Sequence, residues 1–282
     1  MTLRFAVIGR PIAHSLSPAM HSAALAALGL DATYVAREVA PHELPAIVGE
    51  LRDGTLAGAN VTIPHKVAIA ALCDRLEVDA RTIGAVNTIS LEAGAVVGTN
   101  TDVVGLLASL APHEAALRGR GVVILGAGGA ARAAVAVARR LEAHGITIVA
   151  RRPEEARVLG ADLSVCALAD RAAIAAVFEE AALVVQASSA TMTSSTSTAA
   201  DAAAFVEALP LETLSSSAVV TDLVYRPRRT ALLDACEARG LTTIDGTEML
   251  VQQGAASLAG WLGRDVASLP IDAMRRAVHD AL

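Results

Sequence analysis

The stretch Gly121-Val-Val-Ile-Leu-Gly-Ala-Gly-Gly-Ala-Ala-Arg132 decides the fold of this chain. Its apolar residues Val122–Leu125 predict a buried strand, and the alanine-rich residues Ala130–Leu141 that follow predict a helix. The glycines between them let the backbone turn sharply and approach a pyrophosphate closely at the N-terminus of that helix. A glycine turn in this strand-to-helix context predicts a dinucleotide-binding domain of the Rossmann type, with a doubly wound parallel sheet.

The same region predicts which dinucleotide binds. The phosphate-binding turn is expected to comprise Gly126, Ala127, Gly128, Gly129 and Ala130. The next predicted strand, Ile146–Ala150, ends in Arg151-Arg152, where an NAD-preferring site usually has Asp or Glu. Two guanidinium groups can bind a 2′-phosphate in a fork, so the predicted cofactor is NADP. A turn without a ligand and two solvated surface arginines are the structural alternatives.

Strand-like and helix-like segments alternate on both sides of this stretch, which predicts an α/β protein. The strands expected in the N-terminal part are Arg4–Ile8, Thr33–Val39, Leu56–Val61, Ala85–Leu91 and Val96–Asn100, and they suggest a largely parallel sheet. The helices expected there are Pro18–Leu28, Pro45–Leu51, His65–Leu72 and Thr101–Leu110. Further strands are expected at Leu183–Ala187 and Ala218–Tyr225, separated by a mobile loop at Ser188–Ala200.

These elements suggest two domains. Residues 1–103 and 250–282 are expected to form an N-terminal α/β substrate domain, because the helical C-terminal segment should return to it. Residues 104–249 are expected to form the dinucleotide-binding domain. The active site is predicted in the cleft between the two domains, since open α/β sheets bind ligands at the carboxyl ends of their strands.

Composition excludes several classes of function. The net charge of −6 argues against a general nucleic-acid binder, which needs a basic face. No apolar run reaches the ~18 residues that a membrane span needs, and the first residues lack a signal-peptide pattern, so we expect a cytoplasmic protein without a membrane partner. The cysteines Cys73, Cys166 and Cys236 lack metal-ligand spacing, and no metal site is expected.

The chain contains a single lysine. All but one of its 23 Lys and Arg residues are Arg, and the exception is Lys66. A coding bias explains the excess of Arg, but it does not explain why one Lys is kept. Because Lys can titrate whereas Arg stays protonated, Lys66 is predicted to transfer a proton.

Four polar clusters lie at the ends of the N-terminal strands: Gly9–Pro18, Asn60–Lys66, Gly84–Thr88 and Gly98–Asp102. Two hydroxyls at a helix entrance can both donate to a carboxylate. Neutral hydrogen-bonding groups with one cation and one anion suit a polyhydroxylated carboxylic acid. The predicted recognition set is Ser15, Ser17, Asn60, Thr62, Lys66, Asn87 and Asp102.

In this order the motifs Gly-x-Pro-x-x-His-Ser-x-Ser-Pro, Asn-Val-Thr-x-Pro-x-Lys, Gly-Ala-x-Asn-Thr and Asn-Thr-Asp-x-x-Gly resemble those of the shikimate dehydrogenase family. The resemblance covers nearly the whole chain. It implies that Ser15 and Ser17 hold the substrate carboxylate and that Lys66 and Asp102 are the catalytic pair. It further implies ring-hydroxyl contacts from Asn60, Thr62, Asn87, Asp102 and Gln253, a phenol near the carboxylate from Tyr225, and cofactor contacts from Arg151, Arg152, Ser188 and Gly246.

The resemblance implies NADPH-dependent reduction of 3-dehydroshikimate to shikimate by a monomer or homodimer, in the synthesis of aromatic amino-acid precursors. A quinate or aminoshikimate dehydrogenase and a metabolite sensor without catalysis are the alternatives. An unrelated folate- or tRNA-linked reductase would leave the Ser-x-Ser-Pro motif without a purpose. Ala150, Gln186 and Glu248 depart from the family pattern, which places cofactor preference and rate in question more than substrate class.

Overall fold

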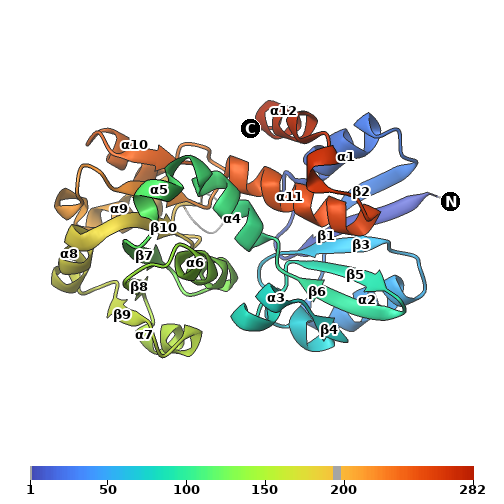
Figure 1. Cartoon of the computed structure of the whole chain (residues 1–282), viewed down its shortest axis with the longest axis horizontal. Helices are drawn as coiled ribbons and strands as arrows, with labels where there is room; N and C mark the ends of the chain where they lie inside the picture. Colours follow the sequence, from blue (N-terminus) through green and yellow to red (C-terminus); the bar gives the residue numbers. More distant parts are fainter. Residues whose placement is uncertain (1, 193–197) are drawn as a thin grey trace. The chain divides into compact units, whose positions relative to one another are not determined.

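The structure is a computed structural model that describes residues 2–192 and 198–282 (Figure 1). The chain forms two compact units: unit 1 comprises Met1–Leu106 with Glu248–Leu282, and unit 2 comprises Leu107–Thr247. The boundaries expected from the sequence, at 103 and 250, lie close to these. Within the described ranges no helix is both long enough and apolar enough to cross a membrane.

Unit 1 is built on a six-stranded sheet in the order β2-β1-β3-β5-β6-β4. Its strands are β1 (Leu3–Gly9), β2 (Ala32–Glu38), β3 (Gly58–Val61), β4 (Arg75–Leu76), β5 (Thr88–Glu92) and β6 (Ala95–Thr99). β5 runs antiparallel to both β3 and β6, so the expected largely parallel sheet is wrong at this strand. The reason is local: Ala93 and Gly94 both have positive φ, 48° and 83°, and this two-residue turn folds β5 and β6 into a hairpin.

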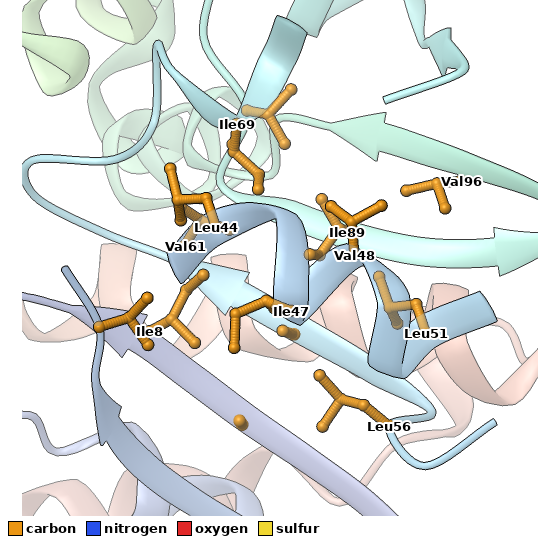
Figure 2. Close-up of a cluster of buried hydrophobic side chains, with 14 of the residues drawn as sticks. Ile8, Leu44, Ile47, Val48, Leu51, Leu56, Val61, Ile69, Ile89 and Val96 are labelled. Carbon is orange, nitrogen blue, oxygen red and sulfur yellow. The ribbon is translucent and has the colours of Figure 1, made fainter. Parts of the chain in front are cut away.

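The helices of unit 1 are α1 (Ser17–Ala27), α2 (Leu44–Arg52), α3 (Val78–Ile83), α11 (Thr247–Leu262), α12 (Ile271–Asp280) and the first half of α4 (Asp102–Leu110). α2 shows how the sequence seats a helix on the sheet. Its buried residues Leu44, Ile47, Val48 and Leu51 recur with the period of one helix face. Figure 2 shows them packed over Ile8, Val61, Ile89 and Val96 of the strands.

The helix predicted at His65–Leu72 is not formed. Residues 63–68 make turns, and only Ile69–Leu72 form a short 3₁₀ segment. The Lys66 carbonyl accepts the Val86 backbone N–H at 2.8 Å instead of a hydrogen bond from its own segment. The His65 ring is buried, with Nε2 2.7 Å from the Val39 carbonyl. Long-range bonds therefore replace the helical ladder that the local sequence pattern favours.

Unit 2 contains six parallel strands in the order β12-β11-β10-β7-β8-β9. They are β7 (Gly121–Leu125), β8 (Ile146–Ala150), β9 (Ser164–Ala167), β10 (Ala181–Gln186), β11 (Val219–Asp222) and β12 (Thr242–Ile244). This order confirms the predicted Rossmann-type sheet, in which the direction of winding reverses between β7 and β10. The sequence pattern does not predict β9 and β12.

α5 (Glu114–Leu117) precedes β7, and the helices that connect the strands of unit 2 are α6 (Gly129–Arg140), α7 (Pro153–Ala156), α8 (Arg171–Glu180), α9 (Ala199–Ala208) and α10 (Ala231–Glu237). α6 follows the glycine turn directly, as predicted. The loop predicted at Ser188–Ala200 includes residues 193–197, which lie outside the described residues.

Candidate active site

The predicted substrate residues of unit 1 lie along one edge of its sheet. β1 and β3 are parallel and end there, and Asn60 pairs in register with Thr88, which in turn pairs with Thr99 at the end of β6. The loops that follow β1 and β3 are also joined, because the Arg10 N–H donates to the Ile63 carbonyl at 2.9 Å. All four polar clusters of the sequence therefore converge on this edge.

Lys66 and Asp102 form a close ion pair at this edge. Lys66 Nζ lies 2.5 Å from Asp102 Oδ2, and the two side chains are only 14% and 7% exposed. The backbone bond between Val86 and the Lys66 carbonyl fixes the start of the lysine side chain. Asp102 is the first residue of α4, where the helix dipole favours a negative charge. The single lysine is thus a partly buried amine held by one carboxylate.

Asn87 fixes the other oxygen of that carboxylate. Its Oδ1 accepts the Thr101 backbone N–H at 2.8 Å. Because a backbone N–H can only donate, the amide oxygen of Asn87 must face it and the Asn87 Nδ2 must face away. Nδ2 donates to Asp102 Oδ1 at 2.8 Å. It also lies 3.4 Å from Gln253 Oε1. Asn87 therefore orients Asp102 with respect to both Lys66 and Gln253.

Gln253 reaches the sheet edge from α11. Its Nε2 donates to the Leu250 carbonyl at 2.8 Å. α11 comes this close because Gly105 has no side chain: a Cβ there would lie 2.7 Å from the Met249 carbonyl oxygen and 2.8 Å from Gln253 Cβ. Any larger residue at 105 would push Gln253 away from Asn87.

The hydroxyl groups at the start of α1 are arranged to donate. Ser15 Oγ accepts the Ser17 backbone N–H at 3.3 Å, which leaves the Ser15 hydroxyl proton uncommitted. Ser17 is the first residue of α1 and is buried, and its hydroxyl has no partner among the described residues. The half-buried Thr62 hydroxyl likewise has none in the described ranges. Three hydroxyl groups and a helix N-terminus are therefore available to an anion.

Asn60 is held by hydrogen bonds within the protein, and its predicted contact with a ring hydroxyl stays a prediction. Its Nδ2 donates to Thr88 Oγ1 at 3.0 Å and to Ser257 Oγ at 2.8 Å, and its Oδ1 accepts the Tyr34 hydroxyl at 2.7 Å. Both amide protons are thus used within the protein, and only one lone pair of Oδ1 stays open. The geometry favours a structural role for Asn60 beneath the site.

The predicted cofactor turn of unit 2 has the conformation that the sequence requires. Gly126 has φ +119°, and a Cβ on it would lie 3.0 Å from Ser188 Cβ. A Cβ on Gly128, in contrast, would meet no atom within 4 Å, so the space beside it is open. Gly128 is the N-cap of α6, and no side chain caps this helix. The first N–H groups of α6 are free to bind a phosphate.

The two arginines after β8 are not equivalent. Arg152 Nη1 forms an ion pair with Glu155 at 2.6 Å. Arg151 is exposed and has no partner among the described residues, so its guanidinium is available to a 2′-phosphate. The residues of the turn and Arg151 together fit NADP, and the predicted contacts of Arg151 and Arg152 with the 2′-phosphate stay predictions.

The loop after β10 is tied to the end of the sheet by buried polar groups. Gln186 Oε1 accepts from both the backbone N–H and the hydroxyl of Ser188, at 2.9 and 2.8 Å, and its Nε2 donates to Thr191 Oγ1 at 3.0 Å. Gln186 pairs in register with Asp222 of β11, whose carboxylate also accepts from the Thr191 hydroxyl. Burial raises the pKa of Asp222 to about 6. Gln186 and Asp222 therefore hold Ser188 against Gly126.

The remaining predicted residues belong to unit 2. Tyr225 is half-buried, three residues after β11. Gly246 packs closely on the end of β11, since a Cβ there would lie 2.6 Å from the Leu223 carbonyl oxygen. The structure therefore gives Gly246 a packing role, and the predicted roles of Tyr225 and Gly246 toward ligands stay predictions.

Comparison with known proteins agrees with this geometry. The sequence model of the shikimate dehydrogenase substrate binding domain matches residues 7–89. The shikimate dehydrogenase (NADP(+)) of Symbiobacterium thermophilum is 42% identical to this chain, over 98% of the chain and 93% of that protein. The chain belongs to the shikimate dehydrogenase family.

Solved structures related to the family share the whole fold. The Thermus thermophilus shikimate 5-dehydrogenase in complex with NADP(H) and shikimate is 35% identical and superposes with a TM-score of 0.83 over 100% of both chains. The 5-ketofructose reductase of Gluconobacter sp. strain CHM43 is 29% identical, with a TM-score of 0.80 over 100% of this chain and 99% of that one. Because a shikimate dehydrogenase and a 5-ketofructose reductase share this one fold, the fold alone does not select the substrate.

Two departures from the shikimate dehydrogenase pattern have structural explanations. Gln186 replaces an asparagine and, as described, holds the loop after β10. Glu248 forms a double hydrogen bond with Arg275 of α12, with both distances 2.8 Å, and accepts from Gln252 at 2.7 Å. Glu248 thus ties α11 to α12. Ala150 is the buried last residue of β8, and nothing in the structure explains it further.

Sequence reasoning missed the buried hydroxyl groups of Thr88, Thr101 and Ser257. Thr88 directly follows Asn87 and Thr101 directly precedes Asp102, so their place beside predicted site residues was a signal that the sequence offered. Ser257 lies one helical turn after Gln253, and this spacing of four residues was the only signal for it.

Proposed function

We propose that this protein catalyses the reversible, NADPH-dependent reduction of 3-dehydroshikimate to shikimate, in the cytoplasmic synthesis of aromatic amino-acid precursors. The observation that carries the proposal is the partly buried Lys66–Asp102 pair, with Asn87 bound to the second carboxylate oxygen. The chain's membership of the shikimate dehydrogenase family supports the same reaction and cofactor.

Recognition of the substrate follows from the groups left open in unit 1. The hydroxyls of Ser15 and Ser17 would donate to the carboxylate, assisted by the N-terminus of α1 and, by the family resemblance, by Tyr225. The Thr62 hydroxyl and the second Nε2 proton of Gln253 would bind ring hydroxyls. Neutral donors suit a polyol because each substrate hydroxyl needs a partner when water is excluded.

The chemistry that this chain supplies is proton transfer and orientation. NADPH, when bound by the glycine turn and Arg151, supplies the hydride. Lys66 Nζ donates a proton to the former ketone oxygen as negative charge develops on it, and Asp102 holds the amine in position through the 2.5 Å contact. A proton donor placed in this way contributes roughly 10²–10⁴ to the rate. In the reverse direction Lys66 accepts the proton from the shikimate hydroxyl.

The test is initial-rate oxidation of shikimate and of quinate by the purified full chain, each with NADP and with NAD. We expect the highest kcat/KM for shikimate with NADP. Faster turnover of quinate, or with NAD, would assign the sister activity instead. A folded protein that binds shikimate in isothermal titration calorimetry but turns over neither substrate would be a sensor, and this would overturn the proposal.

A further inference from the structure

Ser257 lies at the centre of a hydrogen-bonded network beneath the candidate site. It is 1% exposed, and it is carried by α11 one turn after Gln253. Its Oγ lies 2.8 Å from Asn60 Nδ2, 2.8 Å from Thr88 Oγ1 and 3.1 Å from Thr101 Oγ1. It also lies 3.0 Å from the Gln253 carbonyl oxygen. One hydroxyl group therefore joins α11 to β3, β5 and the segment after β6.

The network leads directly to the group that orients Asp102. Thr88 Oγ1 donates to Asn87 Oδ1 at 3.0 Å, and Thr101 Oγ1 lies 3.2 Å from the same oxygen. Each threonine hydroxyl has a single proton and several neighbours. Thr88 Oγ1 also accepts from Asn60 Nδ2 and Thr101 Oγ1 also accepts from Asn87 Nδ2, both at 3.0 Å, so Ser257 is one of the groups that set the direction in which each hydroxyl points. Removing the serine hydroxyl would take away the contacts, at 2.8 and 3.1 Å, that help to hold the Thr88 and Thr101 hydroxyls beside Asn87.

We infer that Ser257 is a positioning residue for the reaction: it fixes the orientation of Asn87, and through it Asp102, and it fixes the place of Gln253 on α11. This inference rests on the proposed function. Ser257 touches none of the catalytic pair. It acts through Asn87, whose Nδ2 holds Asp102 Oδ1 at 2.8 Å. A cluster satisfied on all sides is rigid, and a small misplacement of a catalytic group has a large effect on rate.

The network conveys orientation and not protons. Asn87 stands between the hydroxyls and Asp102, and a neutral amide neither gains nor loses a proton in the working pH range. The far end is equally fixed, because the Tyr34 hydroxyl donates to Asn60 Oδ1 at 2.7 Å and its ring stacks on His21 at 4.1 Å. The observable consequence is therefore a change in kcat and in the KM for shikimate, not in the KM for NADP.

Ser257→Ala is the primary variant, because it removes the hydroxyl without adding volume. We expect kcat to fall roughly fivefold to tenfold, the loss that one orienting hydrogen bond corresponds to, while the KM for NADP stays within about twofold of wild type. The KM for shikimate should rise about twofold to threefold, since Gln253 is less well placed. Tyr34→Phe, which keeps the stacked ring, should change the same parameters in the same direction to a smaller extent.

Leu258→Ala is the matched control. Leu258 is the next residue of α11 and is fully buried, but its side chain cannot take part in the network. It should lower the melting temperature at least as much as Ser257→Ala while leaving kcat within about twofold of wild type. Equal losses of kcat in Ser257→Ala and Leu258→Ala would overturn the inference, and so would unchanged kcat and KM in Ser257→Ala and Tyr34→Phe. In either case turnover by the wild-type protein would still support the proposed function. Wild-type protein without turnover would refute the proposed function and the inference with it.

Discussion

Asp222 offers a quantitative test of the electrostatics at the carboxyl edge of unit 2. It is 0% exposed at the end of β11, and its carboxylate accepts from the Val224 N–H at 3.0 Å and the Thr230 hydroxyl at 2.8 Å. Burial nevertheless raises the pKa of Asp222 to about 6, because these hydrogen bonds and that from Thr191 offset only part of the desolvation. The perturbation is Asp222→Asn, which keeps the shape and removes the titration.

The magnitude follows from the shift. The pKa of an unfolded Asp is about 3.9, so folding raises it by about two units, and each unit corresponds to about 1.4 kcal/mol. A carboxyl group with a raised pKa binds its proton more tightly in the folded state. Its stabilising effect is therefore full below pH ~4 and is lost as the pH rises through about 6. The free energy of unfolding of wild type relative to Asp222→Asn should fall by about 2 kcal/mol between pH 4 and pH 7, because the unfolded carboxyl is already partly ionised at pH 4.

The assay is urea unfolding of both proteins at several pH values, followed by far-UV circular dichroism. Contributions of all other titrating groups cancel in the difference between the two proteins. Fluorescence of Trp261, the only tryptophan and a residue of unit 1, serves as the internal control for that unit. A difference that stays constant from pH 4 to pH 7, or that grows in favour of wild type as the pH rises, would refute the reasoning.

Three further outcomes are expected. Lys66→Ala should lower kcat about 100-fold or more, and Lys66→Arg should not restore it despite its charge, because Arg does not release a proton; an Arg variant as fast as wild type in steady-state assays would contradict this. Arg151→Ala should raise the KM for NADP about tenfold or more without changing the KM for NAD. Arg152→Ala should raise the KM for NADP less, because Arg152 is already paired with Glu155 in the wild-type protein. Initial rates measured with both cofactors check both expectations. Burial lowers the pKa of His21 to about 3, and its ring nitrogens have no hydrogen-bond partner among the described residues, so its stabilising effect is present above pH ~6.5 and is lost as the pH falls toward 3. Between pH 7 and pH 5 the free energy of unfolding of wild type should therefore fall by about 2 kcal/mol more than that of His21→Phe. Equal falls for the two proteins in urea titrations would argue against this effect of His21.

Local sequence was sufficient for the features that depend on backbone conformation and burial alone. The apolar run before Gly126 and the alanine-rich segment after it predicted β7, the turn and α6, because strand, turn and helix each have their own residue preferences. The single lysine and its polar motif also pointed to the proposed proton donor, since no other side chain of the chain is a primary amine. The edge of the sheet on which the motifs converge followed from the rule that ligands bind at strand ends.

Tertiary structure decided which polar groups are left for a ligand. Asn60 and Ser257 are 197 residues apart, and their hydrogen bond exists only because α11 packs on the sheet of unit 1. In the same way, the bond from Val86 to the Lys66 carbonyl replaced the helix expected at His65–Leu72, and a two-residue turn reversed β5. A sequence motif specifies which donors and acceptors are present. Whether each is spent on a buried partner or stays open to a substrate depends on distances between segments remote in sequence, because a buried polar group bonds to whatever the packed fold places within about 3 Å.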